Sequence, residues 1–133
     1  MRQIVRDGIV LATYIPAQTA WRPGLNFFSA DGDFVQVGTW GYDAGKVLAR
    51  HAHNRVTRAV THTQEVLLIR RGRLRADIYD AAGVLAEQVE AGPGDLLVLL
   101  NGGHGYEVLE DGTEVLEIKN GPYPGADLDR TRF

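Results

Sequence analysis

The sequence predicts an all-β fold, and three observations support this. The 16 glycines and 5 prolines fall largely in closely spaced turn signals that separate short apolar runs. Residues 73–79 alternate strictly between polar and apolar side chains, which is the period of a half-buried strand. No long helical pattern is present, and only residues 84–91 could pass for a helix, too short to be stable alone. Strands of this length and spacing are typical of a sandwich or barrel.

The elements follow in order along the chain. Residues 4–15 form an N-terminal strand, and residues 47–53 form a strand that begins with Val47 and Ala49 on one face. Residues 65–69 and 96–100 are apolar enough to be buried strands. Residues 104–109 and 113–119 are expected to pair as a hairpin around Asp111-Gly112. The tail from Gly121 onward is extended coil.

Length and composition limit the function classes. A chain of 133 residues predicts one domain, spanning residues 1–133. The formal charge is −3, so we expect no nucleic-acid partner, because phosphate binding requires a basic patch or stripe. The absence of cysteine excludes thiolate catalysis and cysteine-ligated metals. No apolar run is long enough to span a membrane and no signal peptide is recognised, so we expect a cytoplasmic protein.

Histidines and one glutamate mark a candidate site. His51 and His53 are two residues apart, so on a strand both imidazoles lie on the face that carries Val47 and Ala49. Glu65 shares a face with Leu67 and Ile69, and a carboxylate pointing inward must be paired or bound to a metal. Downstream, glycines flank His104 and allow close approach of a ligand. A pair of solvent-exposed strand histidines is the alternative interpretation of the first two residues.

These residues, in this order, resemble the two motifs of the cupin superfamily. Five residues separate Gly45 from His51-Ala52-His53, six residues separate Glu65 from Gly72, and Gly94-Asp95 precedes His104. The resemblance covers about half of the chain and implies a double-stranded β-helix (jelly-roll) barrel. It also implies that His51, His53, Glu65 and His104 hold a divalent metal. Three imidazoles and a carboxylate suit Fe, Mn, Ni, Co, Cu or Zn. The eleven residues between His53 and Glu65 are expected to form a loop over the pocket.

Other polar residues near these motifs have two interpretations each. Tyr106 shares the His104 face and is either a wall of the pocket or a catalytic proton donor. Arg55 and Arg58 follow the histidine pair and are candidates for binding an anionic substrate. His62 is expected at the surface of a loop, and Gln64 on the strand face opposite Glu65.

Three functions are compatible with this sequence. The first is a metal-dependent enzyme, of oxygenase or isomerase type, acting on a small oxygen-rich substrate. The second is a non-enzymatic module that binds a sugar or organic acid, and the third is a metal-independent enzyme similar to sugar-nucleotide epimerases. We further expect a homodimer, in which residues 4–15 and the aromatic residues 21–28 cover sheet edges of a partner.

Overall fold

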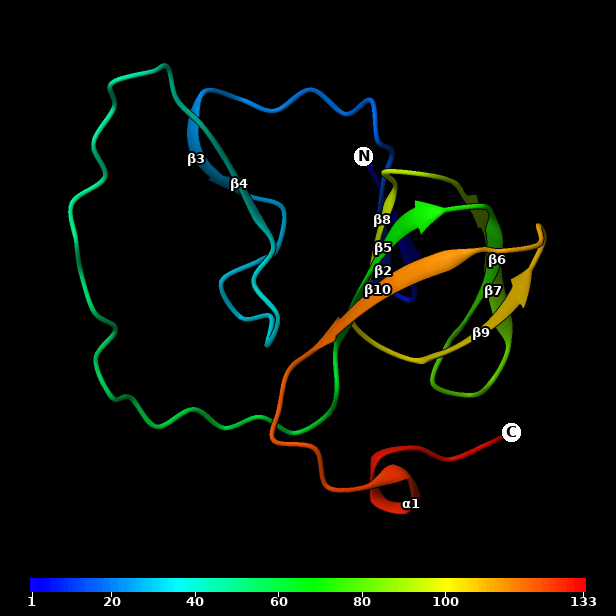
Figure 1. Cartoon of the computed structure of the whole chain (residues 1–133). Coiled ribbons are helices and arrows are strands. Elements are labelled where there is room, and N and C mark those ends of the chain that lie inside the picture. Colours follow the sequence, from blue (N-terminus) through cyan, green and yellow to red (C-terminus); the bar gives the residue numbers. More distant parts are fainter.

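Ten strands build the protein, and the computed structural model describes all of residues 1–133 (Figure 1). The elements are β1 (Arg2–Arg6), β2 (Ile9–Ile15), β3 (Gly24–Phe27), β4 (Gly38–Gly41), β5 (Glu65–Arg71), β6 (Leu74–Tyr79), β7 (Leu85–Ala91), β8 (Leu96–Leu99), β9 (Gly103–Val108), β10 (Glu114–Lys119) and α1 (Ala126–Asp129). The prediction of an all-β fold is confirmed. The one helix has four residues, and none is long and apolar enough to cross a membrane.

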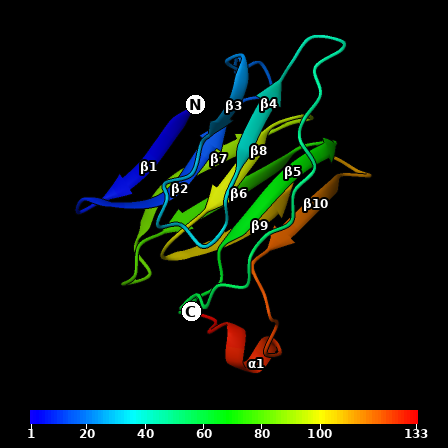
Figure 2. The same ribbon diagram turned by 90° about the vertical axis from the view of Figure 1, so that its left-hand side faces the viewer.

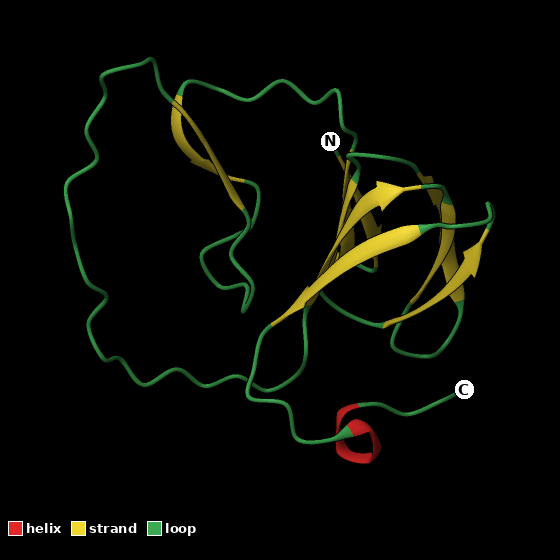
Figure 3. Ribbon diagram, viewed as in Figure 1, coloured by secondary structure: helices red, strands yellow, loops and turns green.

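The strands form two packed sheets and a separate hairpin (Figure 3). The five-stranded sheet has the order β1-β2-β8-β5-β10, and the three-stranded sheet has the order β7-β6-β9. All pairs are antiparallel. Strands β3 and β4 pair only with each other and lie on a long arm, residues 17–63, that leaves the sheets after β2 and returns at β5.

The core lies between the two sheets and follows the alternation seen in the sequence. Leu74, Ala76 and Ile78 of β6 are buried, while the residues between them are only partly covered. They pack against Leu67 and Ile69 of β5 in one apolar cluster. The buried strands expected at residues 65–69 and 96–100 are present as β5 and β8, and Glu65 points inward with Leu67 as predicted.

Three predicted elements differ from the structure. Residues 47–53 are not a strand but belong to a stretch, residues 46–61, that has no regular backbone pairing, because no strand lies beside it. Residues 4–15 are not one strand, since Asp7 and Gly8 have positive φ and turn the chain between β1 and β2. The candidate helix at residues 84–91 is strand β7, because it pairs along its length with β6.

The predicted hairpin of residues 104–109 and 113–119 is also wrong. Strand β9 pairs with β6, whereas β10 pairs with β5 in the other sheet, so the connection between them crosses from one layer to the other. The crossing packs against the β5–β6 connection, where Thr113 Oγ1 accepts a hydrogen bond from Arg73 N over 3.2 Å. A Cβ on Gly72, whose φ is +73°, would lie 2.7 Å from the Thr113 Cα, so only glycine allows this contact.

Figure 2 shows the five-stranded sheet stacked on the three-stranded sheet. On one side, here called the closed side, β1 and β7 are joined by an ion pair between Arg2 and Glu87, and Arg6 Nε lies 3.6 Å from Asp80 Oδ2. On the other side, here called the open side, β9 and β10 each pair with only one strand, so their outer edges are free. The closed barrel implied by the cupin resemblance therefore stays a prediction, because it requires further strands at these two edges.

Asp95 forms hydrogen bonds with three segments of the chain at the end of the sandwich where β8 begins. Its carboxylate accepts hydrogen bonds from Tyr14 Oη, Ala17 N and Gly92 N, each 2.8 Å long. Burial, followed by the bond to Asp95, raises the pKa of Tyr14 to about 12. Asp95 therefore joins the end of β2 to the turn between β7 and β8.

Replacing Asp95 by alanine should lower the free energy of unfolding by about 3 kcal/mol, because buried donors lose a charged acceptor. Urea unfolding of Asp95→Ala measures this change. Asp111→Ala is the matched control, because Asp111 is an exposed turn residue that should change stability by less than about 0.5 kcal/mol. Equal stability of the two variants would contradict the role given to Asp95.

Candidate functional site

The candidate site lies on the open side of the sandwich, on the inward faces of β5, β9 and β10. The register places His104 opposite Ile78 and Tyr106 opposite Ala76, so both side chains point to the core face of the three-stranded sheet. Lys119 pairs with Glu65, which places both on the inner face of the five-stranded sheet. Four polar side chains from three strands therefore meet between the sheets.

Glu65 is the centre of this cluster and is 6% exposed. Lys119 Nζ lies 2.7 Å from its Oε1, and His104 Nε2 lies 3.3 Å from its Oε2. Burial by itself raises the pKa of Glu65, but the proximity of His104 and Lys119 lowers it to about 2. Glu65 is therefore an ionised carboxylate at neutral pH inside an apolar sandwich.

One oxygen of this carboxylate is not satisfied. Oε2 of Glu65 is buried and accepts no hydrogen bond, although His104 is close to it. Buried polar atoms in folded proteins nearly always have a partner, so an unpartnered charged oxygen needs an explanation. The side chain of His104 is about one-third exposed, so solvent reaches the imidazole that lies beside this carboxylate.

Tyr106 lies beside His104, with ring centroids 5.2 Å apart. Burial and then the negative charges of Glu65 and Glu117 raise the pKa of Tyr106 above its usual range. Its hydroxyl therefore stays protonated and can donate a hydrogen bond. Tyr106 is 41% exposed, so it borders the open side of the cluster instead of filling the core.

Lys119 is a site residue that the sequence reasoning missed. Its ammonium contacts Glu117 Oε1 at 3.0 Å as well as Glu65, and hydrogen bonding to Glu65 is the main cause of its raised pKa. The signal was present in the alternation of residues 114–119, which places Glu117 and Lys119 on one strand face. That face could be assigned to the interior only once β10 was known to pair with β5.

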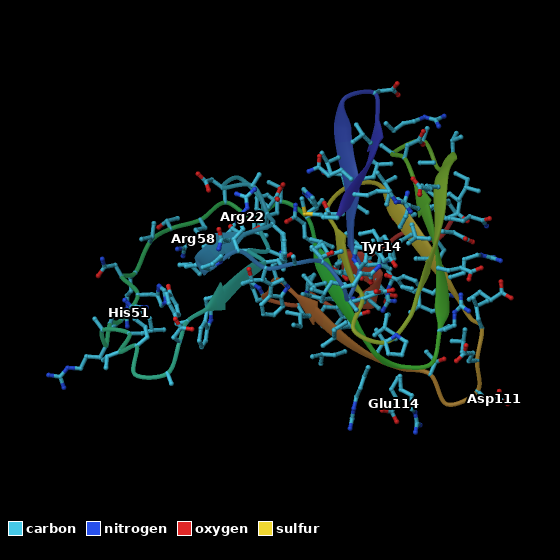
Figure 4. All side chains as sticks on the ribbon, turned by 90° about the horizontal axis from the view of Figure 1, so that it is seen from above. Tyr14, Arg22, His51, Arg58, Asp111 and Glu114 are labelled. Atoms are coloured by element: carbon cyan, nitrogen blue, oxygen red, sulfur yellow. The ribbon has the colours of Figure 1, made fainter.

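His51 and His53 lie apart from this cluster. Both are exposed on residues 42–63 of the arm, their ring centroids are 5.2 Å apart, and His51 Nδ1 is 3.2 Å from the carbonyl oxygen of Ala49, two residues earlier in the chain. Figure 4 shows His51 on the arm, well separated from the sheets. The structure thus brings together Glu65 and His104 but not the histidine pair. No group of three or more histidine or acidic side chains is placed to hold a metal.

Arg55 and Arg58 share the arm with the histidine pair. Both are exposed, and neither forms an ion pair with Glu65 or any other residue. Figure 4 shows Arg58 on the arm, away from the two sheets. Charge is distributed unevenly between the arm and the sheets. Residues 42–63 carry four basic side chains and one acidic, a net charge of +3, whereas residues 64–119 carry five basic and eleven acidic, a net charge of −6.

His62 and Gln64 lie on the opposite side of the five-stranded sheet, as predicted. His62 Nε2 is 3.0 Å from Leu100 O, and its ring packs edge-on against Phe34. The carbonyl of the Gln64 side chain accepts hydrogen bonds from Phe34 N and Val35 N. Both residues attach the arm to the sheet and neither reaches the Glu65 cluster.

Comparison with known proteins identifies no relative: no family model, no curated protein and no solved structure matches this chain.

Replacing Lys119 by methionine should lower the free energy of unfolding by about 3 kcal/mol, because it leaves a buried carboxylate without its closest cation. Thermal and urea unfolding measure the loss, and Glu65→Gln in the same chain should recover part of it. Glu117→Gln is the control, because this more exposed partner should contribute less than about 1 kcal/mol. A Lys119→Met variant as stable as the native chain would show that Lys119 does not neutralise Glu65.

Proposed function

We propose that the protein is a small metal-dependent enzyme of the cupin type, acting on a small oxygen-rich substrate at Glu65 and His104. The observation that carries the proposal is the unpartnered Oε2 of Glu65, buried beside His104 Nε2. A carboxylate oxygen and an imidazole nitrogen are ligand types that divalent transition metals accept, and together they are half of a four-ligand set. These two residues therefore fit the metal that the sequence resemblance implies.

His51 and His53 would complete the set once residues 42–63 close over the open side. Three features support this movement. Strands β9 and β10 have free edges, and unpaired edges favour the addition of a strand. Val47 and Leu48 of the segment are exposed apolar residues without a partner. The positive segment also complements the negative sheets.

Closure of this kind would place the strand of residues 47–53 along β9 and turn the open sandwich into the jelly-roll barrel. The eleven residues between His53 and Glu65 can span roughly 35 Å when extended, which is ample for the connection. The same movement would bring Arg55 and Arg58 to the rim of the pocket, where their guanidinium groups can pair with a carboxylate or phosphate.

The residues of the cluster have separate tasks in such a site. His51, His53, Glu65 and His104 would hold the metal, which supplies Lewis-acid polarisation of a chelating substrate or a position for O₂. Tyr106 keeps its proton and can donate it to an oxygen of the substrate. Lys119 keeps Glu65 ionised.

A second candidate is metal-independent acid–base catalysis, of the kind expected for an epimerase-like enzyme. It is favoured by Lys119, whose ammonium lies 2.7 Å from Glu65. Because this cation already balances the buried carboxylate, a metal is not required to neutralise it. In that case Glu65 would orient the His104 imidazole as a base, and Tyr106 beside it would be the acid. A non-enzymatic module that binds a sugar or organic acid would use the same residues without turnover.

Metal content decides between the first two functions. Elemental analysis should find one divalent transition metal per chain in the native protein and loss of it in His51→Ala, His53→Ala, Glu65→Gln and His104→Ala, because three ligands bind more weakly than four. His62→Ala is the matched control and should keep its metal. Full occupancy in a His51→Ala/His104→Ala double variant would end the four-ligand proposal, and a metal-free native protein would favour the acid–base site.

Turnover of a bound ligand under O₂ separates an enzyme from a binding module.

Small chelating acids should bind at the metal with help from the arm. Calorimetric titration with oxalate or a 2-oxoacid should show affinity reduced roughly 10- to 150-fold in Arg55→Ala or Arg58→Ala, the effect of losing one charge-assisted hydrogen bond. Arg22→Ala is the control, since Arg22 precedes β3 and lies outside residues 42–63. Unchanged affinity in both arginine variants would favour a neutral, sugar-like ligand.

A further inference from the structure

The β3–β4 hairpin exposes an apolar face that nothing covers. Leu25 pairs with Trp40 across the ladder, and Phe27 lies two residues further along the same face. All three side chains are more than half exposed. The other face carries Asn26 and Thr39, and Thr39 is buried. A hairpin that turns its polar face inward and its apolar face outward is the reverse of the usual arrangement.

The chain's own sheets do not reach this face, because the turn of the hairpin is fixed in place. Phe28 and Val35 of the turn pack on the outer surface of the five-stranded sheet against Val66 and Val98. Phe28 N donates to Val37 O at 2.8 Å, which continues the ladder of β3 and β4 into the turn. The hairpin is therefore held in one direction, and Figure 1 shows it projecting away from the sheets.

A second apolar patch lies on the outer surface of the same sheet, next to the turn. Leu116 and Ile118 of β10 pair with Leu68 and Val66, so they point outward, away from the Glu65 cluster. Each is more than half exposed. This patch continues the surface on which the turn already packs, up to the free edge of the sheet.

We propose that a second copy of this chain covers both surfaces. In a symmetric pair, Leu25, Phe27 and Trp40 of each copy pack on Leu116 and Ile118 of the other. Because the pair has two-fold symmetry, the contact between the hairpin face of one copy and the β10 patch of the other occurs twice. The ten side chains would remove on the order of 1,000 Å² of accessible surface, which approaches the size of a stable protein interface. Charged residues are absent from both patches, as in the centre of protein interfaces.

This interface is independent of the metal site, because it uses the outer face of β10 whereas Glu65 and Lys119 use the inner face. It differs from the dimer expected from the sequence in one respect. The proposed contacts do not use residues 4–15, which pair with each other as β1 and β2, and the aromatic segment acts through β3 and β4.

Sedimentation equilibrium tests the proposal at micromolar concentration. The native protein should have twice the 14.6 kDa mass of the chain. Phe27→Ser/Trp40→Ser and Leu116→Asn/Ile118→Asn should each give monomers with an unchanged circular dichroism spectrum. Val56→Asn is the matched control, because Val56 is equally exposed on the arm but lies outside both patches, and it should stay dimeric. A monomeric native protein, or a dimer that survives either double variant, would overturn the assignment.

The absence of cysteine provides a second, direct test. Mixing a Phe27→Cys variant with an Ile118→Cys variant should give a mixed disulfide-linked dimer on mild oxidation. Mixing Phe27→Cys with Ala81→Cys is the control, because Ala81 lies in the exposed turn between β6 and β7 and should give no faster cross-linking than free diffusion. Equal yields from the two mixtures would contradict the proposed contact.

Discussion

The buried carboxylate of Glu65 is the constraint on which the rest of the site depends. A charge between two apolar sheets is tolerated only when charged or polar groups lie close by, and the fold supplies them from two directions. Lys119 comes from the neighbouring strand of the same sheet, and His104 comes from the facing sheet. Both contacts require the chain to cross between layers at Gly72 and Thr113, because this crossing places β10 beside β5 and β9 opposite. The site is therefore a product of how the strands are divided between the sheets.

The sandwich is unequal on its two sides, and the candidate site lies on one of them. An ion pair between β1 and β7 closes one side, whereas β9 and β10 remain accessible on the other. The polar cluster lies on the accessible side, and Tyr106 borders it. Residues 42–63 carry the complementary charge, two histidines and exposed apolar residues, and a long segment without its own pairing is typical of a functional loop. Under the proposed function, the chemistry of the site would depend on this segment, which the sheets do not hold.

The two halves of the arm have different physical roles. Residues 24–41 are anchored by the packing of Phe28 and Val35 and by the Gln64 side chain, so their apolar face has a fixed direction suited to a partner molecule. Residues 42–63 have no such anchor until His62. The arm therefore joins a fixed apolar face, which we propose as an assembly surface, to the segment that we propose closes over the candidate site.

The sequence by itself determined the strands at residues 65–69 and 73–79 and which of their side chains face inward. Alternation at residues 73–79 and the apolar run after Glu65 are local properties, because side chains on neighbouring residues of any strand point to opposite faces. Turn residues likewise marked most strand ends. Only the tertiary structure decided which strands are neighbours: β9 and β10 are consecutive yet lie in different sheets, and Lys119 became a site residue for that reason alone. The alternation at residues 47–53 was the same kind of signal. A strand forms only when it pairs with another strand, however, and no strand lies beside this segment in the structure. Partners far apart in the chain, not local pattern, determine whether such a segment pairs.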